Sequence, residues 1–376
     1  MTAPHLFTPF QTLSVRFKNR IVLSPMCQYS AVDGHVTDWH LAHHARFALG
    51  GVGGAIIEAT GVLPEGRITP GCLGLWSDEQ VPGLARIAAL YHSEAIPVGI
   101  QLSHAGRKAS AARPFDGAAP LGPDSPEPAW QTVAPSALAH DAAWPTPHAL
   151  DEAEIAGIVQ AFADATRRAM AAGLDFVEIH GAHGYLINTF FSPISNKRTD
   201  GYGGSLENRM RFALEVTEAV RAALPADKPL FYRVSAVDGV EGGVTIEDTV
   251  ALSRALAARG VDVVDASSGG ILGPVARAAT RPTPGFQVPY ADAIRHGAGV
   301  ATMAVGLIVE PHQAEAVLAE GHADLVAIGR ELLADGDFAY RAALELGLEN
   351  PSSVLPQKYA FYLSRRKAVL APAKAG

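Results

Sequence analysis

The feature that most constrains the fold is a strict alternation of strand-like and helix-like runs. Short apolar runs that predict strands recur eight times along the 376 residues, and helical spacing of apolar positions separates them. Strands that alternate with helices form parallel sheets, and eight such units favour a closed (β/α)8 TIM barrel. We therefore expect a single α/β domain over 1–376, with an irregular tail from about residue 349. The predicted strands are 19–24, 52–60, 96–102, 176–179, 230–235, 261–266, 301–305 and 323–328.

The segment 103–148 interrupts this alternation. It is rich in Pro, Gly and Ala, has no clear period and contains Trp130 and Trp144. An irregular segment of this length inside a compact domain is usually functional or disordered, and the two tryptophans favour an ordered cap inserted into the barrel. The predicted helices on either side of it are 38–49, 79–94, 151–173, 207–223, 245–260, 288–297, 310–320 and 337–347.

The most distinctive strand end is the run His180-Gly-Ala-His183-Gly-Tyr185. Catalytic groups of a TIM barrel lie at the C-terminal ends of its strands. Two neutral imidazole N–H groups that converge there would hold an oxygen gaining negative charge, and Tyr185 offers a phenolic proton. Two other interpretations are packing histidines and a pair of metal ligands. A metal would need a third ligand, and no CxxC motif occurs, so we predict no metal site.

Two glycine-containing loops follow the seventh and eighth predicted strands, at Gly306 and at Gly329-Arg330. These loops commonly bind phosphate in TIM barrels, and a guanidinium suits a phosphate geometrically. Each loop alone is also compatible with an ordinary helix cap. Their occurrence together favours a phosphate-bearing ligand. No GxGxxG motif follows an early strand, which counts against an open dinucleotide-binding sheet.

The charge and cysteine content exclude several classes of protein. The chain has 30 basic and 38 acidic residues, a net charge of −8 and no basic block, so we expect no nucleic-acid partner. No uncharged apolar run is long enough for a bilayer, and the N-terminus lacks the layout of a signal peptide. Cys27 and Cys72 make no disulfide framework, which predicts a cytoplasmic protein.

Five motifs give the chain a resemblance to the Old Yellow Enzyme family of FMN-dependent ene-reductases, from Leu6 to at least Gly347. Within that family it is similar to the YqjM and xenobiotic reductase A subgroup, which carries a cysteine beside the flavin. The motifs are NRIVLSPMC (19–27), PEGRIT (64–69), QLSHAGRK (101–108), HGAHGYL (180–186) and SNKRTDGYGGSLENR (195–209).

The resemblance implies tightly but non-covalently bound FMN at the C-terminal ends of the strands, reduced by NAD(P)H. It also implies three groups of cofactor-binding residues. Ser24, Pro25, Met26 and Cys27 are expected to line the isoalloxazine, Ala59 and Gln101 its pyrimidine side with Arg233 at N1 and O2, and Gly306, Gly329 and Arg330 the phosphate.

The implied reaction is reduction of the activated C=C bond of enones, enals or maleimides, with nitro compounds as a further class. Hydride passes from flavin N5 to Cβ while His180 and His183 hold the carbonyl oxygen, and Tyr185 protonates Cα. Tyr29 is the subgroup's additional substrate contact. Cys27 could be structural, tune the flavin or act as a nucleophile; we favour tuning because ene reduction needs no covalent step.

The resemblance further implies a homodimer or homotetramer in which Arg365 or Arg366 completes a neighbouring active site. Three alternative functions differ from this one in features that can be checked. Two cysteines cannot supply the four-thiolate cluster of iron–sulfur relatives. A barrel aldolase or isomerase with a phosphorylated substrate would be colourless and indifferent to NADPH. A flavin redox sensor would act through Cys27 and turn over slowly.

Overall fold

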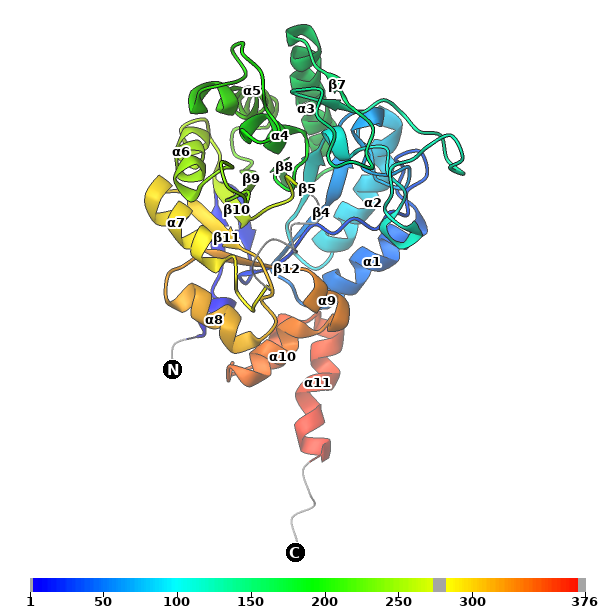
Figure 1. Ribbon diagram of the computed structural model, residues 1–376. Coiled ribbons are helices and arrows are strands. Elements are labelled where there is room, and N and C mark those ends of the chain that lie inside the picture. The colour runs from blue at the N-terminus through cyan, green and yellow to red at the C-terminus, as the bar shows by residue number, and fades with distance from the viewer. Residues whose placement is uncertain (1–2, 273–281, 371–376) are drawn as a thin grey trace, which may run out of the picture.

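The computed structural model describes residues 3–272 and 282–370. Eight parallel strands close into a barrel, and each neighbours the next strand of the barrel along the chain, so the predicted (β/α)8 fold is confirmed (Figure 1). All eight predicted strands occur, with slightly different limits. They are β3 (Ile21–Leu23), β4 (Gly54–Gly61), β5 (Val98–Ser103), β8 (Phe176–Gly181), β9 (Leu230–Ser235), β10 (Val263–Ser267), β11 (Ala301–Ala304) and β12 (Leu325–Ile328).

Helices surround the barrel and cover the outward-facing apolar side chains of the strands. Helix α3 shows how sequence produces this layer. Its apolar residues Ile155, Ile158 and Phe162 recur at helical spacing and are buried, and Asp151 caps its first turn by accepting a hydrogen bond from Glu154 N. The helices of the ring are α1 (Asp38–Leu49), α2 (Val81–His92), α3 (Glu152–Ala171), α5 (Leu206–Ala223), α6 (Ile246–Ala257), α7 (Val288–Ala298), α8 (Pro311–Ala319) and α10 (Phe338–Glu345).

The inward-facing side chains form a separate apolar layer at the N-terminal end of the barrel. Phe176 and Phe231 begin the inward rows of β8 and β9, and their ring centroids are 4.6 Å apart. Phe17 packs against both rings, at 5.8 and 6.2 Å. All three side chains are fully buried. This layer fills the end of the barrel away from the site described below.

Phe17 comes from an antiparallel hairpin of β1 (Phe10–Thr12) and β2 (Val15–Phe17), which closes the N-terminal end of the barrel. The sequence did not predict this hairpin, because strands of three residues are too short for a period to be recognised.

The insert 103–148 is an ordered cap, as predicted. It contains a short two-stranded sheet, β6 (Val133–Ala134) with β7 (His148–Ala149), and is otherwise irregular. Trp130 ties it to the loop after β4, because its Nε1 donates to Glu65 O at 2.9 Å. Arg198 ties it to the loop after β8 by donating to Pro135 O at 3.0 Å.

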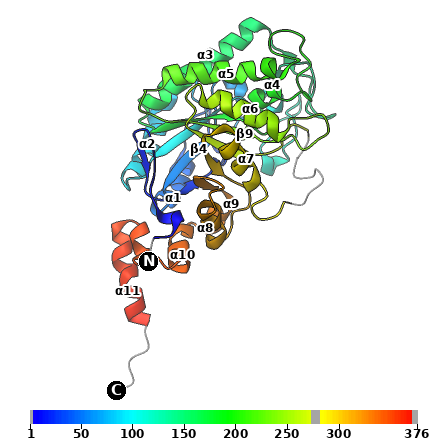
Figure 2. The same cartoon turned by 90° about the vertical axis from the view of Figure 1, so that its left-hand side faces the viewer.

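The expectation of an irregular tail from about residue 349 is wrong for most of that segment. A short turn at Pro351–Val354 leads into helix α11 (Gln357–Leu370), which projects away from the barrel (Figures 1 and 2). Alanine, lysine, arginine and leucine favour helix even where no apolar face repeats. Because α11 has no such face, hydrophobic periodicity does not predict it. Within the described ranges 3–272 and 282–370, no helix has the length and apolar character to cross a bilayer.

Candidate active site

The three aromatic residues singled out in the sequence meet at the C-terminal end of β8. His180 lies on the strand, His183 in the turn that follows, and Tyr185 at the N-terminal cap of the short helix α4 (Leu186–Phe191). The ring centroids of His180 and His183 are 5.0 Å apart, and those of His180 and Tyr185 are 4.9 Å apart. Both pairs are nearly perpendicular. The spacing HxxHxY therefore brings all three side chains to one point.

The turn that carries His183 is held in an unusual backbone conformation. His183 has φ +61° and Gly184 φ +73°, both in the left-handed region. A Cβ at Gly184 would lie 2.0 Å from Gly270 O, so only glycine allows this turn to pack against the loop after β10. Lys108 Nζ fastens the contact by donating to His183 O at 2.9 Å and to Gly270 O at 3.3 Å.

Both histidines are neutral in this environment. Burial lowers the pKa of His180 well below its ordinary value, and His183, Arg233 and Lys108 lower it further. The pKa of His183 is lowered by burial first and then by the same two cations. Ala182 N–H donates to His180 Nδ1 at 3.3 Å, so the hydrogen of the neutral ring is on Nε2. His180 therefore offers an N–H donor.

A hydrogen-bond chain reaches His183 from the end of β10. Gln287 Nε2 donates to Ser267 Oγ at 3.0 Å, and Ser267 Oγ lies 2.7 Å from His183 Nε2. The Ser267 hydroxyl hydrogen is then available to donate to His183 Nε2. In that arrangement the ring hydrogen is on Nδ1, and His183 also keeps one N–H donor.

Tyr185 remains protonated. Its side chain is half-buried, and burial raises the pKa of the phenol far above its ordinary value, with smaller contributions from Cys27 and Cys72. Lys108 Nζ lies 5.3 Å from the centre of the Tyr185 ring. A phenol of raised pKa keeps its proton at neutral pH until a strong base forms nearby.

Beside the histidines, six of the predicted cofactor residues line one cavity of about 220 Å³. They come from four different strand ends, and the closing of the barrel brings them together. The six are Ser24, Met26, Arg233, Gly306, Gly329 and Arg330.

The other predicted residues lie around this cavity. Cys27 follows Met26 in the loop after β3, and its thiol is within hydrogen-bond reach of the backbone of Ala59 and of the Tyr29 side chain. Gln101 points inward from β5, and Pro25 follows Ser24 in the loop. Burial raises the pKa of the Cys27 thiol well above its ordinary value, and Cys72 and Glu58 add to the rise. Cys27 is therefore a neutral thiol.

The cavity fits FMN. Arg233 lines the cavity, and among the described residues its Nε has an ion pair with Asp265 but no hydrogen-bond partner, so its guanidinium suits the anionic side of a reduced flavin. Glycine keeps this part of the cavity free of side chains at two positions. A Cβ at Gly329 would lie 3.2 Å from Met26 Sδ, and a Cβ at Gly306 would lie only 2.6 Å from Gln287 Oε1, so a larger residue at either position would crowd the place proposed for the phosphate. Arg330 lines the same cavity as an exposed guanidinium.

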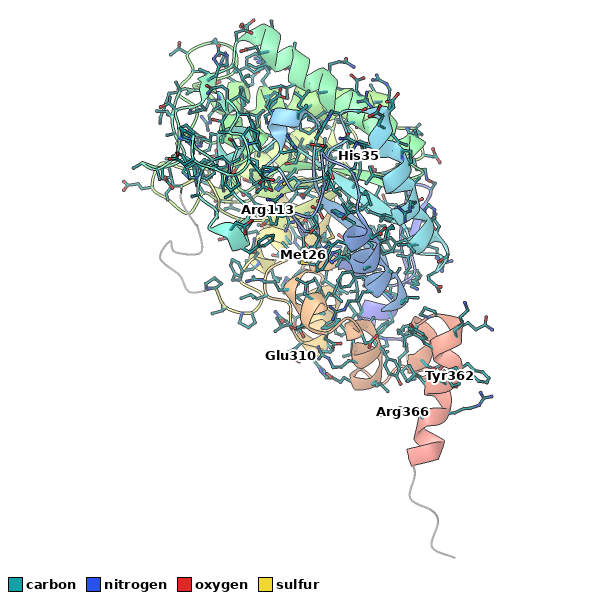
Figure 3. All side chains as sticks on the ribbon, turned by 90° about the vertical axis from the view of Figure 1, so that its right-hand side faces the viewer. Met26, His35, Arg113, Glu310, Tyr362 and Arg366 are labelled. Carbon is teal, nitrogen blue, oxygen red and sulfur yellow. The ribbon has the colours of Figure 1, made fainter. Side chains whose placement is uncertain are left out.

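A larger cavity of about 570 Å³ lies next to the loop after β3, between that loop and the insert. Arg113 links the two walls, since its Nε donates to Tyr29 O at 3.2 Å and its guanidinium forms an ion pair with Glu127. Figure 3 labels Arg113 in the insert and Met26 in the loop after β3. The remaining lining residues include Ala31, Val32, Asp33, Pro64, Glu65, Arg67 and Trp130.

Sequence reasoning missed several residues of this site. Lys108 lies in the motif 101–108 and Ser267 directly follows the sixth predicted strand, but neither position has a sequence signal for its role. Gln287 lies between the sixth and seventh predicted strands and carries no sequence signal. Within the described ranges, no three His, Cys, Asp or Glu residues are grouped in a way that could hold a metal ion.

The chain is similar to known proteins in both sequence and fold. The family model described as NADH:flavin oxidoreductase / NADH oxidase matches residues 5–349. An NADPH dehydrogenase of *Geobacillus thermodenitrificans* is 46% identical over 346 residues, 92% of this chain and 95% of that protein. Among solved structures, morphinone reductase superposes with a TM-score of 0.74 at 28% identity, over 92% of this chain and 90% of that one. A 2-naphthoyl-CoA reductase in complex with 2-naphthoyl-CoA gives 0.80 at 25% identity, over 93% of this chain but only 53% of that longer one.

Proposed function

The chain belongs to the NADH:flavin oxidoreductase / NADH oxidase family and is an FMN oxidoreductase that uses NAD(P)H, and we propose that it reduces alkenes conjugated to a carbonyl group. Enones, enals and maleimides are the proposed substrates, with nitroalkenes as a further class. The observation that supports this proposal best is the meeting of His180, His183 and Tyr185, two neutral donors and one acid within 5.0 Å ring separations.

Six residues that line the cavity would hold FMN: Gly306, Gly329 and Arg330 would receive the phosphate, Arg233 the N1 and O2 side, and Ser24 and Met26 the ring system. On the family resemblance, Pro25 would join them at the ring system, and Ala59 and Gln101 would lie at the pyrimidine side. When bound, FMN supplies the hydride at N5 that reaches the β-carbon of the alkene.

His180 and His183 would hold the carbonyl oxygen of the substrate. Negative charge grows on this oxygen as the β-carbon receives hydride, so donors fixed in advance stabilise the transition state more than the ground state. Each preorganised donor is worth on the order of 3 kcal/mol. Neutral rings suit this task, because Ala182 N–H and the Ser267 hydroxyl donate to one nitrogen of each ring and leave the N–H on the other nitrogen for the substrate.

Tyr185 would donate its proton to the α-carbon. The phenol keeps its proton until the carbanionic carbon forms, because burial raises its pKa. Afterwards the phenolate would lie beside the Lys108 ammonium, which makes the loss of the proton less unfavourable. A positioned general acid of this kind accelerates a step by roughly 10²–10⁴-fold.

Tyr29 would act on the substrate side of the site, and Cys27 would act on the flavin side. Burial raises the pKa of the Tyr29 phenol, so it contacts substrate as a neutral donor. The raised pKa of Cys27 favours a flavin-tuning thiol over a thiolate nucleophile and over a redox sensor, because reactive cysteines need a lowered pKa.

We also propose a cytoplasmic homodimer or homotetramer. Cys27 and Cys72 are both free, which suits a reducing compartment. Helix α11 packs on the turn 351–354 of its own chain and exposes Tyr359, Phe361 and Tyr362. Tyr362 and Arg366 lie far from Met26 of the same chain (Figure 3). Arg365 or Arg366 would therefore serve a neighbouring site, in which Glu65 and Glu127 offer opposite charge.

Anaerobic turnover tests the proposed reaction. The purified protein should be yellow, and addition of NADPH should bleach the flavin. Addition of 2-cyclohexenone should then restore the colour and yield one cyclohexanone per NADPH consumed, measured by gas chromatography. A protein that is colourless and indifferent to NADPH, as a phosphate-binding aldolase or isomerase would be, contradicts the proposal. A reduced flavin that is reoxidised by oxygen but not by enones also contradicts the proposal.

A further inference from the structure

A cluster of three ionisable side chains lies inside the barrel, next to His180. Glu178 points inward from β8, Arg233 from β9 and Asp265 from β10. The strand register places Arg233 opposite His180 on one side and opposite Asp265 on the other. Glu178 and Asp265 are 0% exposed and Arg233 is 6% exposed.

The contacts inside this cluster leave much of its hydrogen-bonding capacity unused. Arg233 Nε lies 3.2 Å from Asp265 Oδ2, an ion pair whose atoms are not aligned as a hydrogen bond. Gln101 Nε2 donates to Glu178 Oε1 at 2.8 Å. Among the described residues, Glu178 Oε2 and both Asp265 oxygens have no hydrogen-bond partner. Two buried carboxyl groups thus lie near one guanidinium, which forms its ion pair with Asp265.

The charges of the cluster do not balance if both carboxyl groups are ionised, because two negative charges face one positive charge. An uncompensated buried charge is costly, and two carboxylates near each other avoid it by keeping a proton. Burial and Asp265 raise the pKa of Glu178 to about 8, against the opposing effects of Arg233 and Gln101. Burial also raises the pKa of Asp265. Of the nearby groups at the end of β8, His180 and His183 are neutral imidazoles and Tyr185 is a neutral phenol, while Lys108 supplies a second cation.

We propose that Glu178 and Asp265 share one proton in the resting enzyme, and that this proton sets the net charge next to the flavin and hence its reduction potential. The inference rests on the proposed position of FMN beside Arg233. With the proton, the cluster is neutral and Arg233 can compensate the negative charge of reduced flavin. Without it, the cluster carries −1 and disfavours reduction.

The proton balance follows from the charges. NAD(P)H delivers two electrons and one hydrogen as hydride, and the reduced flavin carries one negative charge. Where the carboxyl pair is deprotonated before reduction, the new charge raises its pKa, and the pair takes one proton from solvent. The pair returns this proton to solvent when the alkene receives the hydride. Glu178 and Asp265 are therefore positioning residues that act through Arg233.

The first test compares the reduction equilibrium of the wild-type holoenzyme with that of Glu178→Gln across pH 6.5–10, against a reference dye. Gln is close in shape to a protonated Glu and can still accept from Gln101. At neutral pH we expect the two proteins to agree. Above about pH 8 the equilibrium constant for reduction should fall more steeply in the wild type, by up to about tenfold more per pH unit, since one extra proton is taken up. Parallel pH profiles would overturn the proposal.

Infrared spectroscopy tests the proton itself and does not depend on Glu178→Gln folding. Glu58 is another buried carboxyl group whose pKa burial raises to about 8, and it accepts from Gln28 N at 3.1 Å. The measurement is therefore made on Glu58→Gln holoenzyme, so that Glu58 contributes no band of its own. In Glu58→Gln holoenzyme, a band of a protonated carboxyl group should persist at neutral pH and disappear near pH 8. Its absence at neutral pH would overturn the shared proton.

The two proposals fail in different ways. If the enzyme binds FMN but does not reduce enones, the proposed reaction fails while the pH profile and the infrared band remain informative. If enone turnover is normal and the band is absent, the shared proton fails alone.

Discussion

The two ends of the barrel interior use the same strands for opposite purposes. At the N-terminal end, Phe176 and Phe231 stack with Phe17 in a dry layer in which every side chain is apolar and buried. Two residues further along β8 and β9, the inward positions hold Glu178 and Arg233 instead. The first layer stabilises the fold. The second leaves buried polar atoms without partners, a cost that is retained where a ligand needs them.

This comparison predicts that substitutions near the C-terminal end change chemistry and not stability. The largest expected effect on rate is that of Tyr185→Phe, which removes the proton but keeps the ring volume. Alkene reduction should slow by roughly 10²–10⁴-fold. Flavin reduction by NADPH should be unchanged, because that step needs no acid. Anaerobic stopped-flow measurement of each half-reaction checks this.

Tyr340→Phe on α10 is the matched control for that experiment, because Tyr340 is half-buried and remote from the site. It should change neither half-reaction. Nitroalkenes should suffer less than cyclohexenone from Tyr185→Phe, since their product anion is already stable. Equal slowing of both half-reactions in Tyr185→Phe would mean that Tyr185 is not the acid.

At the opposite end, Phe17→Ala should reduce the free energy of unfolding by about 3–5 kcal/mol, because it opens a cavity between Phe176 and Phe231. Turnover per folded molecule should remain at the wild-type level. Urea denaturation and flavin content check the two halves of this statement. The control Phe361→Ala removes a ring that is 52% exposed and should cost about 0.5 kcal/mol or less. A large loss of turnover in folded Phe17→Ala would break the separation between the two ends.

The smallest expected effect is that of Cys27→Ala. Loss of a neutral thiol beside the flavin should shift the reduction potential and alter the balance of the two half-reactions, but turnover should continue. Potentiometry with enone turnover on one preparation measures both. Complete loss of enone reduction with FMN still bound would instead indicate a nucleophile.

Much of the barrel was predictable because its signals are local. Each strand is an apolar run, Asp151 and Thr245 cap helices through their own neighbours, and HxxHxY places three rings at one strand end. The hairpin 10–17 is too short to show a period, and α11 has no repeating apolar face. Hydrophobic periodicity therefore predicts neither element: the strands of the hairpin are too short, and the composition of α11 gives no apolar face.

The cluster of Glu178, Arg233 and Asp265 could not be predicted in the same way. Each residue occurs singly within an apolar strand, and only the closure of the barrel and the strand register bring them together. The chain from Gln287 through Ser267 to His183 has the same origin. Contacts between inward-facing side chains of different strands depend on the shear of the barrel, which no single stretch of sequence specifies.

The central claim is that His180 and His183 hold the oxygen of the substrate beside the flavin. Titration of the oxidised enzyme with 4-hydroxybenzaldehyde tests it without any turnover, because a phenolate bound over the flavin gives a long-wavelength charge-transfer band. The wild type should develop this band, and the double variant His180→Ala/His183→Ala should lose it while keeping its FMN. An undiminished band in the double variant would contradict the claim.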